Sequence, residues 1–392
     1  MSAPWFTVFK KESSENLRDR RTVLNSLVFG PLFGPLLFVI LIGFIMNKAT
    51  ERAEKPLELP VAGAEHAPNL IAFLTQNEVL VEDAPADPEQ SIRDQDTELV
   101  LRIGPDFATR WREGRPAPVE IVYDDSRQFT GASVRRLTRL IEAYGSTHAA
   151  LRLTARGVNP EVARPVAVID RDQSSPQSRA GALLAFLPYM LILGAFLGGM
   201  YLAIDTTAGE RERQTLEALL INPVKRSQIL AGKLLATTAF AFAALAISVA
   251  GFMFFLRFMP TGSLGLSIRL DAVTAALALM TIAPLALLAA SSETLLAAFS
   301  KSFREAQTWL SMLMIVPALP ALVMAVNPVK PVAWMYAAPL VSQHVIISQL
   351  VRGEIVQHWQ FAISIVCTLA LGLVLAYITV RIYHRERLAI ST

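Results

Sequence analysis

Cysteine and charge are both scarce in this chain of 392 residues. The single cysteine, Cys367, excludes an intramolecular disulfide and a cysteine-ligated metal cluster. Charged residues make up 18% of the chain and hydrophobic residues 53%, against about 25% and about 45–50% in soluble globular domains. This composition argues against an ordinary soluble enzyme and against a disordered chain. The formal net charge of +3 is too small to indicate nucleic acid as a partner.

Catalytic motifs are missing as well. The sequence contains no G-x-x-x-x-G-K-[ST] phosphate loop, and Gly232-Lys233 lacks the upstream glycine. It contains no H-E-x-x-H, no G-x-S-x-G and no pair of aspartates within its apolar runs, which argues against an intramembrane hydrolase. His66 and His148 are isolated, so we expect no metal site and no cofactor in this chain.

The charges that are present are unevenly distributed, because 38 of the 69 charged side chains fall within residues 47–180. Outside this stretch, six apolar runs approach the roughly 20 residues that a membrane-spanning helix needs. They are residues 23–46, 181–204, 230–256, 272–299, 308–326 and 361–380. The sequence therefore predicts a polytopic α-helical membrane protein with six transmembrane helices and one polar domain between the first two.

Lysine and arginine in the short connecting segments predict the orientation of these helices. Fifteen lie in residues 1–22, 205–233, the link between the fourth and fifth spans and the tail 381–392, whereas four lie in the short segments opposite. Both termini are therefore expected in the cytoplasm and the polar domain outside it. The first apolar run is too long for a signal peptide and precedes no small-x-small cleavage site, so we interpret it as an uncleaved anchor.

The polar domain, residues 47–180, shows short strands that alternate with helices. Residues 98–103 and 118–123 have strand patterns, 105–114 begins with proline and ends with glycine like a short helix, and apolar residues recur at helical spacing from Val134 to Leu151. Residues 47–66 are interpreted as a polar lead-in, which leaves a small α/β domain. Arg135, Arg136 and Arg139 form either an anion site or, as we favour, a solvated helix face.

A charged segment follows the second span. Leu216, Leu219 and Leu220 form an apolar ridge at helical spacing, charged residues flank it, and Pro223 ends it. This pattern fits a short amphipathic helix that receives force from a soluble partner, and it fits a solvated juxtamembrane loop equally well.

The segment ERERQTLEALLINPVKRSQILAGKL resembles the coupling-helix region of type-2 ABC exporter permeases. The resemblance implies that the residues matching that region contact the partner, namely Glu210, Arg211, Arg213, Thr215, Leu216, Glu217, Leu219, Leu220 and Pro223. Two further stretches agree: residues 9–23 resemble the N-terminal elbow of that family, and residues 339–354 resemble its stretch before the last span. One span, a large outer domain and then five spans is an arrangement similar to that of the sodium-efflux (Nat-type) permeases. The resemblance implies the type-2 ABC exporter fold in a bacterial inner membrane.

The resemblance also implies partners. ATP and Mg²⁺ would bind on a separate ABC ATP-binding subunit, docked on the coupling helix within loop 205–229. Two permease chains, identical or different, would pair in the lipid bilayer. Na⁺ efflux is then the expected function. The alternatives are export of a lipid or amphipathic drug, and a non-transporting transmitter that moves the outer domain.

Two flanking segments are predicted to lie in the membrane interface. Residues 1–22 place apolar Trp5, Phe6 and Phe9 ahead of the cations Lys10, Lys11, Arg18, Arg20 and Arg21, as an amphipathic elbow does. Residues 328–358 are apolar but too short to span, which favours a re-entrant or interfacial helix. His344 within them is expected to be a packed histidine rather than a proton sensor.

Glu293 is the one carboxylate expected well inside a span, within Ser291-Ser292-Glu293-Thr294. An ionisable group at membrane depth is a candidate functional site. Carboxylate and hydroxyl oxygens suit Na⁺ or a proton. The competing interpretation is a helix-end glutamate paired with Arg304 or Lys301.

Overall fold

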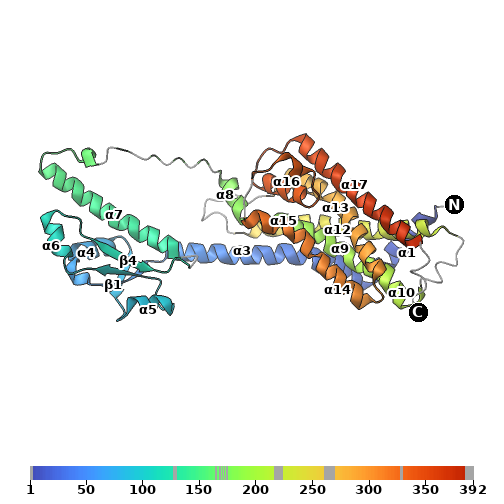
Figure 1. Ribbon diagram of the computed structural model, residues 1–392, viewed down its shortest axis with the longest axis horizontal. Helices are drawn as coiled ribbons and strands as arrows, with labels where there is room; N and C mark the ends of the chain where they lie inside the picture. The colour runs from blue at the N-terminus through green and yellow to red at the C-terminus, as the bar shows by residue number, and fades with distance from the viewer. Residues whose placement is uncertain are drawn as a thin grey trace. The chain divides into compact units, whose positions relative to one another are not determined.

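The structure is a computed structural model that describes residues 3–126, 130–163, 175–215, 224–259, 270–326 and 330–384, with residues 166, 169, 171 and 173. The chain divides into two compact units. One, helical, comprises Met1–Thr50 with Gln173–Thr392, and the other, Glu51–Asp172, contains a sheet. Both are drawn in Figure 1.

Six helices among the described residues are long and apolar enough to cross a membrane, one at each predicted span. They are Arg20–Lys48, Leu187–Glu212, Arg226–Phe258, Ala272–Phe299, Phe303–Met324 and His358–Ile382. The second begins at Leu187 rather than at residue 181, because a separate helix, α8, precedes it. A polytopic helical membrane protein is therefore confirmed.

The helical unit consists of the following elements in chain order. They are α1 (Pro4–Arg18), α2 (Arg20–Val23), η1 (Leu24–Phe29), α3 (Gly30–Glu54, which runs past the boundary of the unit), α8 (Pro176–Leu183), α9 (Leu187–Ile204), η4 (Asp205–Gly209), α10 (Glu210–Glu212), α12 (Arg226–Phe255), η5 (Leu256–Phe258), α13 (Ala272–Phe299), α14 (Phe303–Leu313), α15 (Ile315–Val326), η7 (Ala333–Tyr336), α16 (Val341–Val351) and α17 (His358–His384).

The core of this unit is the junction of α9, α12 and α13, with α17 against α13 (Figure 1). Small residues let these helices approach closely, as is common in membranes. A Cβ added to Gly198 of α9 would overlap the Cβ of Ala244 on α12. By contrast, α3 and α17 leave large apolar side chains such as Phe33, Phe44 and Leu373 exposed. Surfaces of this kind suit lipid or a second chain.

Helix α16 corresponds to the predicted interfacial helix and is too short to span. A buried polar cluster attaches it to α17. The side-chain amide of Gln343 donates to the hydroxyls of Ser364 (3.2 Å) and Thr368 (2.7 Å), and Ser364 donates to Ser342 (2.9 Å). Because the cluster satisfies its own buried polar groups, it fixes α16 against the span at little cost.

The second unit is an α/β domain around a four-stranded sheet in the order β2-β1-β3-β4. Strand β1 (Leu57–Ala62) pairs in parallel with β2 (Val79–Asp83) and β3 (Leu99–Ile103), and β3 pairs antiparallel with β4 (Val119–Tyr123). Its helices are η2 (Ala64–His66), α4 (Pro68–Gln76), α5 (Pro88–Arg93), α6 (Phe107–Glu113), α7 (Thr130–Ala155) and η3 (Pro160–Ala163). Helices α4 and α7 pack against the sheet, with Leu74 and Leu137 fully buried (Figure 1). Both expected strands, the short helix and the long helix are confirmed.

One expectation for this unit is wrong. Residues 47–66 are not a lead-in, because they contain β1, which occupies an interior position of the sheet. This strand was not predicted because of Pro60. Proline cannot donate a hydrogen bond to a neighbouring strand, so its presence argues against a central strand. Leu59 and Val61 nevertheless lie in the core. Of the three helix arginines, Arg136 donates to the carbonyl of Lys55 (3.3 Å) and pairs with Glu78 (3.8 Å).

Candidate functional site

The segment that follows α9 continues it through a π-helical turn, η4, rather than leaving it as a loop. A π-turn adds a residue to the helix and is frequent at functional sites. Thr206, Thr207 and Gly209 of this turn are buried. The carbonyl oxygen of Thr206 accepts a hydrogen bond of 2.8 Å from the ammonium group of Lys233 on α12. The π-turn therefore presents a backbone acceptor to the neighbouring helix.

Lys233 also forms an ion pair with Glu210, the first residue of α10. The side chain of Lys233 is 1% exposed and that of Glu210 is 11% exposed. A buried charge is costly unless it is paired and hydrogen-bonded. Because the ammonium group reaches both the Glu210 carboxylate and the Thr206 carbonyl, the pair joins the start of segment 210–215 rigidly to α12.

Helix α1 packs on α12 beside this pair. A Cβ added to Gly232 would lie 2.6 Å from the backbone oxygen of Trp5 and 2.7 Å from the Cβ of Val8, so only glycine permits this approach. Glu12 of α1 is 97% buried. Burial raises the pKa of the Glu12 carboxyl above its usual value, although the nearby ammonium groups of Lys233 and Lys11 lower it in part. The elbow predicted from sequence is thus a helix joined to α12.

Segment 210–215 also forms hydrogen bonds with the residues that connect α13 to α14. The guanidinium of Arg211 donates to the carbonyl oxygens of Ala298 and Ser300, both at 2.8 Å. These carbonyls end α13 and would otherwise lack helical partners. The Glu212 carboxylate accepts a bond of 2.7 Å from the backbone N–H of Phe303, the first residue of α14. One short segment therefore caps two spans.

The remaining described residues of the segment face outward. Arg213 pairs with Asp205 at 2.9 Å. Arg213 and Thr215 are exposed, and the Thr215 hydroxyl donates to the carbonyl of Glu210 (3.3 Å). Five of the predicted contact residues lie outside the described residues: Leu216, Glu217, Leu219, Leu220 and Pro223.

The other face of α1 carries the exposed side chains of the predicted elbow. Trp5 and Phe6 are exposed, while Phe9 turns inward against Ala236 and Phe240. The five predicted cations are all exposed: Lys10, Lys11, Arg18, Arg20 and Arg21. The helix is therefore fixed along one side and presents aromatic and cationic groups along the other.

Glu293 of α13 is completely buried, and neither of its carboxylate oxygens has a hydrogen-bond partner among the described residues. It lies at the junction of α9, α12 and α13. A Cβ added to Gly199 of α9 would lie 2.7 Å from the Glu293 Oε2 and 3.2 Å from the Thr237 methyl of α12. The alternative of an ion pair with Arg304 or Lys301 is wrong, because the carboxylate is directed into the bundle.

The hydroxyls next to Glu293 do not all share its surroundings. Residues two apart on a helix point about 200° away from each other, so Ser291 lies on the opposite side of α13 from Glu293. The Ser292 hydroxyl donates to carbonyls of its own helix, at 2.9 Å each. Thr294 is buried with no hydroxyl partner among the described residues. A single ion therefore cannot contact all four of the predicted oxygens.

Sequence reasoning missed two parts of this arrangement. It counted Lys233 among the cations of the short connecting segments, and it did not predict that Arg211 and Glu212 bond to backbone atoms of other helices. The signal for Lys233 was a lone cation at the start of a long apolar helix. For Arg211 and Glu212 the sequence carried no signal, because their partners are backbone atoms about 90 residues away.

Comparison with known proteins agrees with this architecture. The chain is similar to the ABC transporter permease protein NatB of Bacillus subtilis (strain 168), with 24% identity over 355 residues, which cover 89% of this chain and 90% of that protein. Residues 26–381, all but the N-terminal helix and the tail, match the family described as ABC-2 family transporter protein. The six apolar helices among the described residues agree with this match. The chain is therefore a member of the ABC-2 transporter family.

Proposed function

We propose that this chain is the permease subunit of an ATP-driven exporter and that a separate ABC subunit binds ATP and Mg²⁺. Membership of the ABC-2 family and the missing phosphate loop both support a partner ATPase. In this proposal both termini and segment 205–229 face the cytoplasm, and the α/β domain lies outside it. Two permease chains pair in the bilayer, and the exposed apolar sides of α3 and α17 are available for contact.

The observation that carries this proposal is the set of bonds made by residues 205–215. Through Glu210, Arg211 and Glu212 the segment is attached to α12, to the end of α13 and to the start of α14. A partner that pushes on residues 216–223 would therefore move three spans and, through α12, the elbow helix α1. A solvated loop would need neither the buried Lys233 contacts nor the bonds of Arg211 and Glu212 to two other spans.

The test is coupling in reconstituted complex. The chain is purified with its ATPase, and the variants Glu217→Ala and Leu220→Ala are compared with Lys225→Ala. Lys225 is exposed and lies beyond residues 205–223. We expect the first two to lose transport or transport-stimulated ATP hydrolysis while the permease remains folded in the membrane. Unchanged stimulation in both would refute the coupling assignment.

For the cargo we propose a monovalent cation, Na⁺ or H⁺, carried past Glu293. An uncompensated carboxylate in an apolar interior is costly, and a bound cation or proton removes that cost. The resemblance to sodium-efflux permeases points to the same class. Export of a lipid or amphipathic drug is the second candidate, favoured by the otherwise apolar junction around Glu293.

ATP-driven uptake into inside-out vesicles, which corresponds to export from the cell, tests this assignment. Glu293→Gln keeps the shape and removes the charge, so we expect cation transport to be lost while assembly with the ATPase persists. Ser292→Ala is the control, because that hydroxyl bonds only its own helix. Cation transport at the parent rate in Glu293→Gln would exclude Glu293. Loss of lipid or drug transport instead would support the second candidate. ATP hydrolysis by the parent complex without transport of a cation, a lipid or a drug would support a mechanical transmitter.

A further inference from the structure

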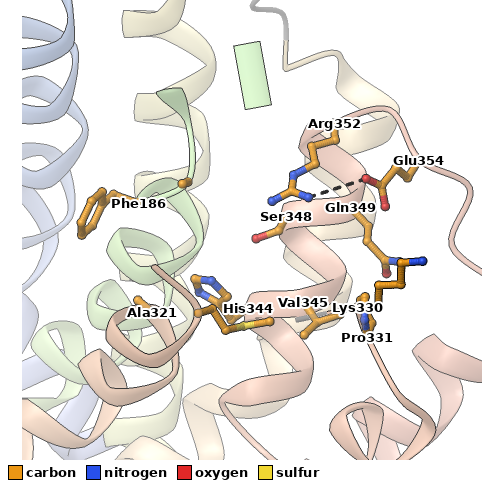
Figure 2. Close-up of a pocket in the computed structure, with 12 residues that line it drawn as sticks. Phe186, Ala321, Lys330, Pro331, His344, Val345, Ser348, Gln349, Arg352 and Glu354 are labelled. Carbon is orange, nitrogen blue, oxygen red and sulfur yellow. Dashed lines mark ion pairs between the residues drawn. The ribbon is translucent and has the colours of Figure 1, made fainter. Parts of the chain in front are cut away.

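A cavity of about 410 Å³ lies at the end of α9 that is remote from segment 205–215. It is bordered by Ala185 and Phe186, just before α9, by the end of α15, by Lys330 and Pro331, and by α16 with the residues that follow it (Figure 2). The 18 residues of α9 are about 27 Å long. The cavity therefore lies about one hydrocarbon thickness from the segment that receives the ATPase, at the level where lipid headgroups are found.

The two sides of the cavity differ in chemistry. Phe186, Ala321 and Met324 form an apolar wall, and the Phe186 side chain is 54% exposed. Lys330 and Arg352 supply positive charge and Glu354 one negative charge. Figure 2 shows Lys330 and Glu354 on the Gln349 side of α16 and Phe186 on the His344 side. The site is therefore amphipathic, with an excess of one positive charge.

The cations retain free hydrogen-bonding capacity. The Arg352 guanidinium is 3.8 Å from the Glu354 carboxylate, and both side chains are nearly half exposed. This distance exceeds that of a charge-assisted hydrogen bond, about 2.7–2.9 Å, so the donors of Arg352 are available for another acceptor. Lys330 makes no ion pair with any described residue. An anion bound between Lys330 and Arg352 would accept hydrogen bonds from both side chains.

His344 is a second, independent indication of a ligand. It lines the cavity and is 94% buried, yet its Nδ1 has no hydrogen-bond partner in the described part of the chain. Burial and the charge of Arg352 lower the pKa of His344 to about 4, so the ring is neutral at physiological pH and has one donor and one acceptor. The Gln349 Oε1 accepts from the Tyr336 hydroxyl (3.3 Å), which leaves its amide N–H₂ as a further donor.

We propose that this cavity binds the anionic headgroup of an amphiphile. Its phosphate or carboxylate lies between Lys330 and Arg352, polar headgroup atoms meet His344 and Gln349, and its apolar chain follows Phe186, Ala321 and Met324. A cation is disfavoured by the two positive side chains, and a purely apolar molecule would leave His344 unsatisfied. This site is separate from Glu293 and does not depend on the nature of the cargo.

Native mass spectrometry of the purified full chain tests the proposal. The protein is released from nanodiscs of phosphatidylcholine with one-fifth phosphatidylglycerol, and retained phosphatidylglycerol is counted. We expect the double variant Lys330→Gln/Arg352→Gln to retain it at least ten-fold more weakly than the parent chain. Arg257→Gln, which removes an exposed cation outside the cavity, should retain it unchanged.

Three further readings complete the test. A size-exclusion profile equal to that of the parent shows that the double variant is folded. If millimolar inorganic phosphate displaces phosphatidylglycerol and also binds in the absence of lipid, the anion site belongs to free phosphate rather than to a headgroup. The proposal of a bound amphiphile is then overturned. Equal retention in the double variant and in Arg257→Gln likewise overturns the proposal. None of these three readings requires ATP hydrolysis or cation transport.

Discussion

The ammonium group of Lys233 on α12 is paired with the carboxylate of Glu210 on α10, and both side chains are withdrawn from solvent. The same ammonium group bonds the Thr206 carbonyl that the π-turn η4 presents. Glu12 of α1 is close enough for its pKa to be affected by Lys233. One buried cation therefore joins the α9–α10 segment to the third span, and Gly232 on the same span lets the elbow helix pack beside it.

Lys233→Met is expected to destabilise the chain strongly, because it leaves the Glu210 carboxylate buried without its counter-charge. Removing one partner of a buried pair costs about 3–5 kcal/mol. The midpoint of thermal unfolding in detergent should fall accordingly. The double variant Lys233→Met/Glu210→Gln should recover part of the loss, whereas Lys225→Met, an exposed lysine, should change little. Equal midpoints for Lys233→Met and Lys225→Met would contradict the pairing.

Gly232→Val is expected to displace α1 from α12, because the added side chain would occupy the position of the Trp5 backbone and Val8. In a background with Cys367→Ser, a cysteine at Val8 should then react faster with a membrane-impermeant maleimide. Gly43→Val is the matched control, since a Cβ there meets nothing within 4 Å. Similar labelling rates in the two glycine variants would show that α1 does not depend on Gly232.

Hydrophobic run length was sufficient to predict all six spans, because crossing a membrane requires about 20 apolar residues whatever the tertiary structure. The strand at 57–62, by contrast, was not predicted. Its Pro60 is tolerated only in the context of the neighbouring strands, which one segment of sequence does not reveal.

The candidate site was predicted unevenly. Motif spacing singled out 210–223 and depth singled out Glu293 as candidates, and the structure describes residues 210–215 and Glu293. Which charges turn inward was not predictable, since that depends on partners distant in sequence: Lys233 for Glu210, and backbone atoms of α13 and α14 for Arg211 and Glu212. Helical spacing, in contrast, already separated Ser291 from Glu293, and a prediction that had used the 200° angle would have excluded a site containing both.

Arg211→Lys is expected to weaken the connection between segment 210–215 and the end of α13, because an ammonium group cannot reproduce the planar fork that reaches both the Ala298 and Ser300 carbonyls. Each buried carbonyl left unsatisfied costs about 1–3 kcal/mol. In the reconstituted complex, ATP hydrolysis should continue while transport per ATP falls several-fold. Arg257→Lys is the control, because its side chain is exposed and lies outside residues 205–223. An equal transport-to-ATP ratio in both variants would refute this role.

His344 is expected to make the stability of the chain depend on pH below neutrality. Its pKa is lowered from 6.5 to about 4 by burial and by Arg352, so between these values the unfolded chain binds a proton that the folded chain does not. Stability therefore falls as the pH decreases from 6.5 to 4, by roughly 3 kcal/mol from this residue, and is unaffected by it above pH 7. Thermal midpoints of the parent chain and of His344→Gln, measured from pH 7.5 to 4.5, should converge as the pH falls, because the parent loses stability that the variant never titrates. Parallel curves over this range would show that His344 is protonated as readily in the folded chain as in the unfolded one.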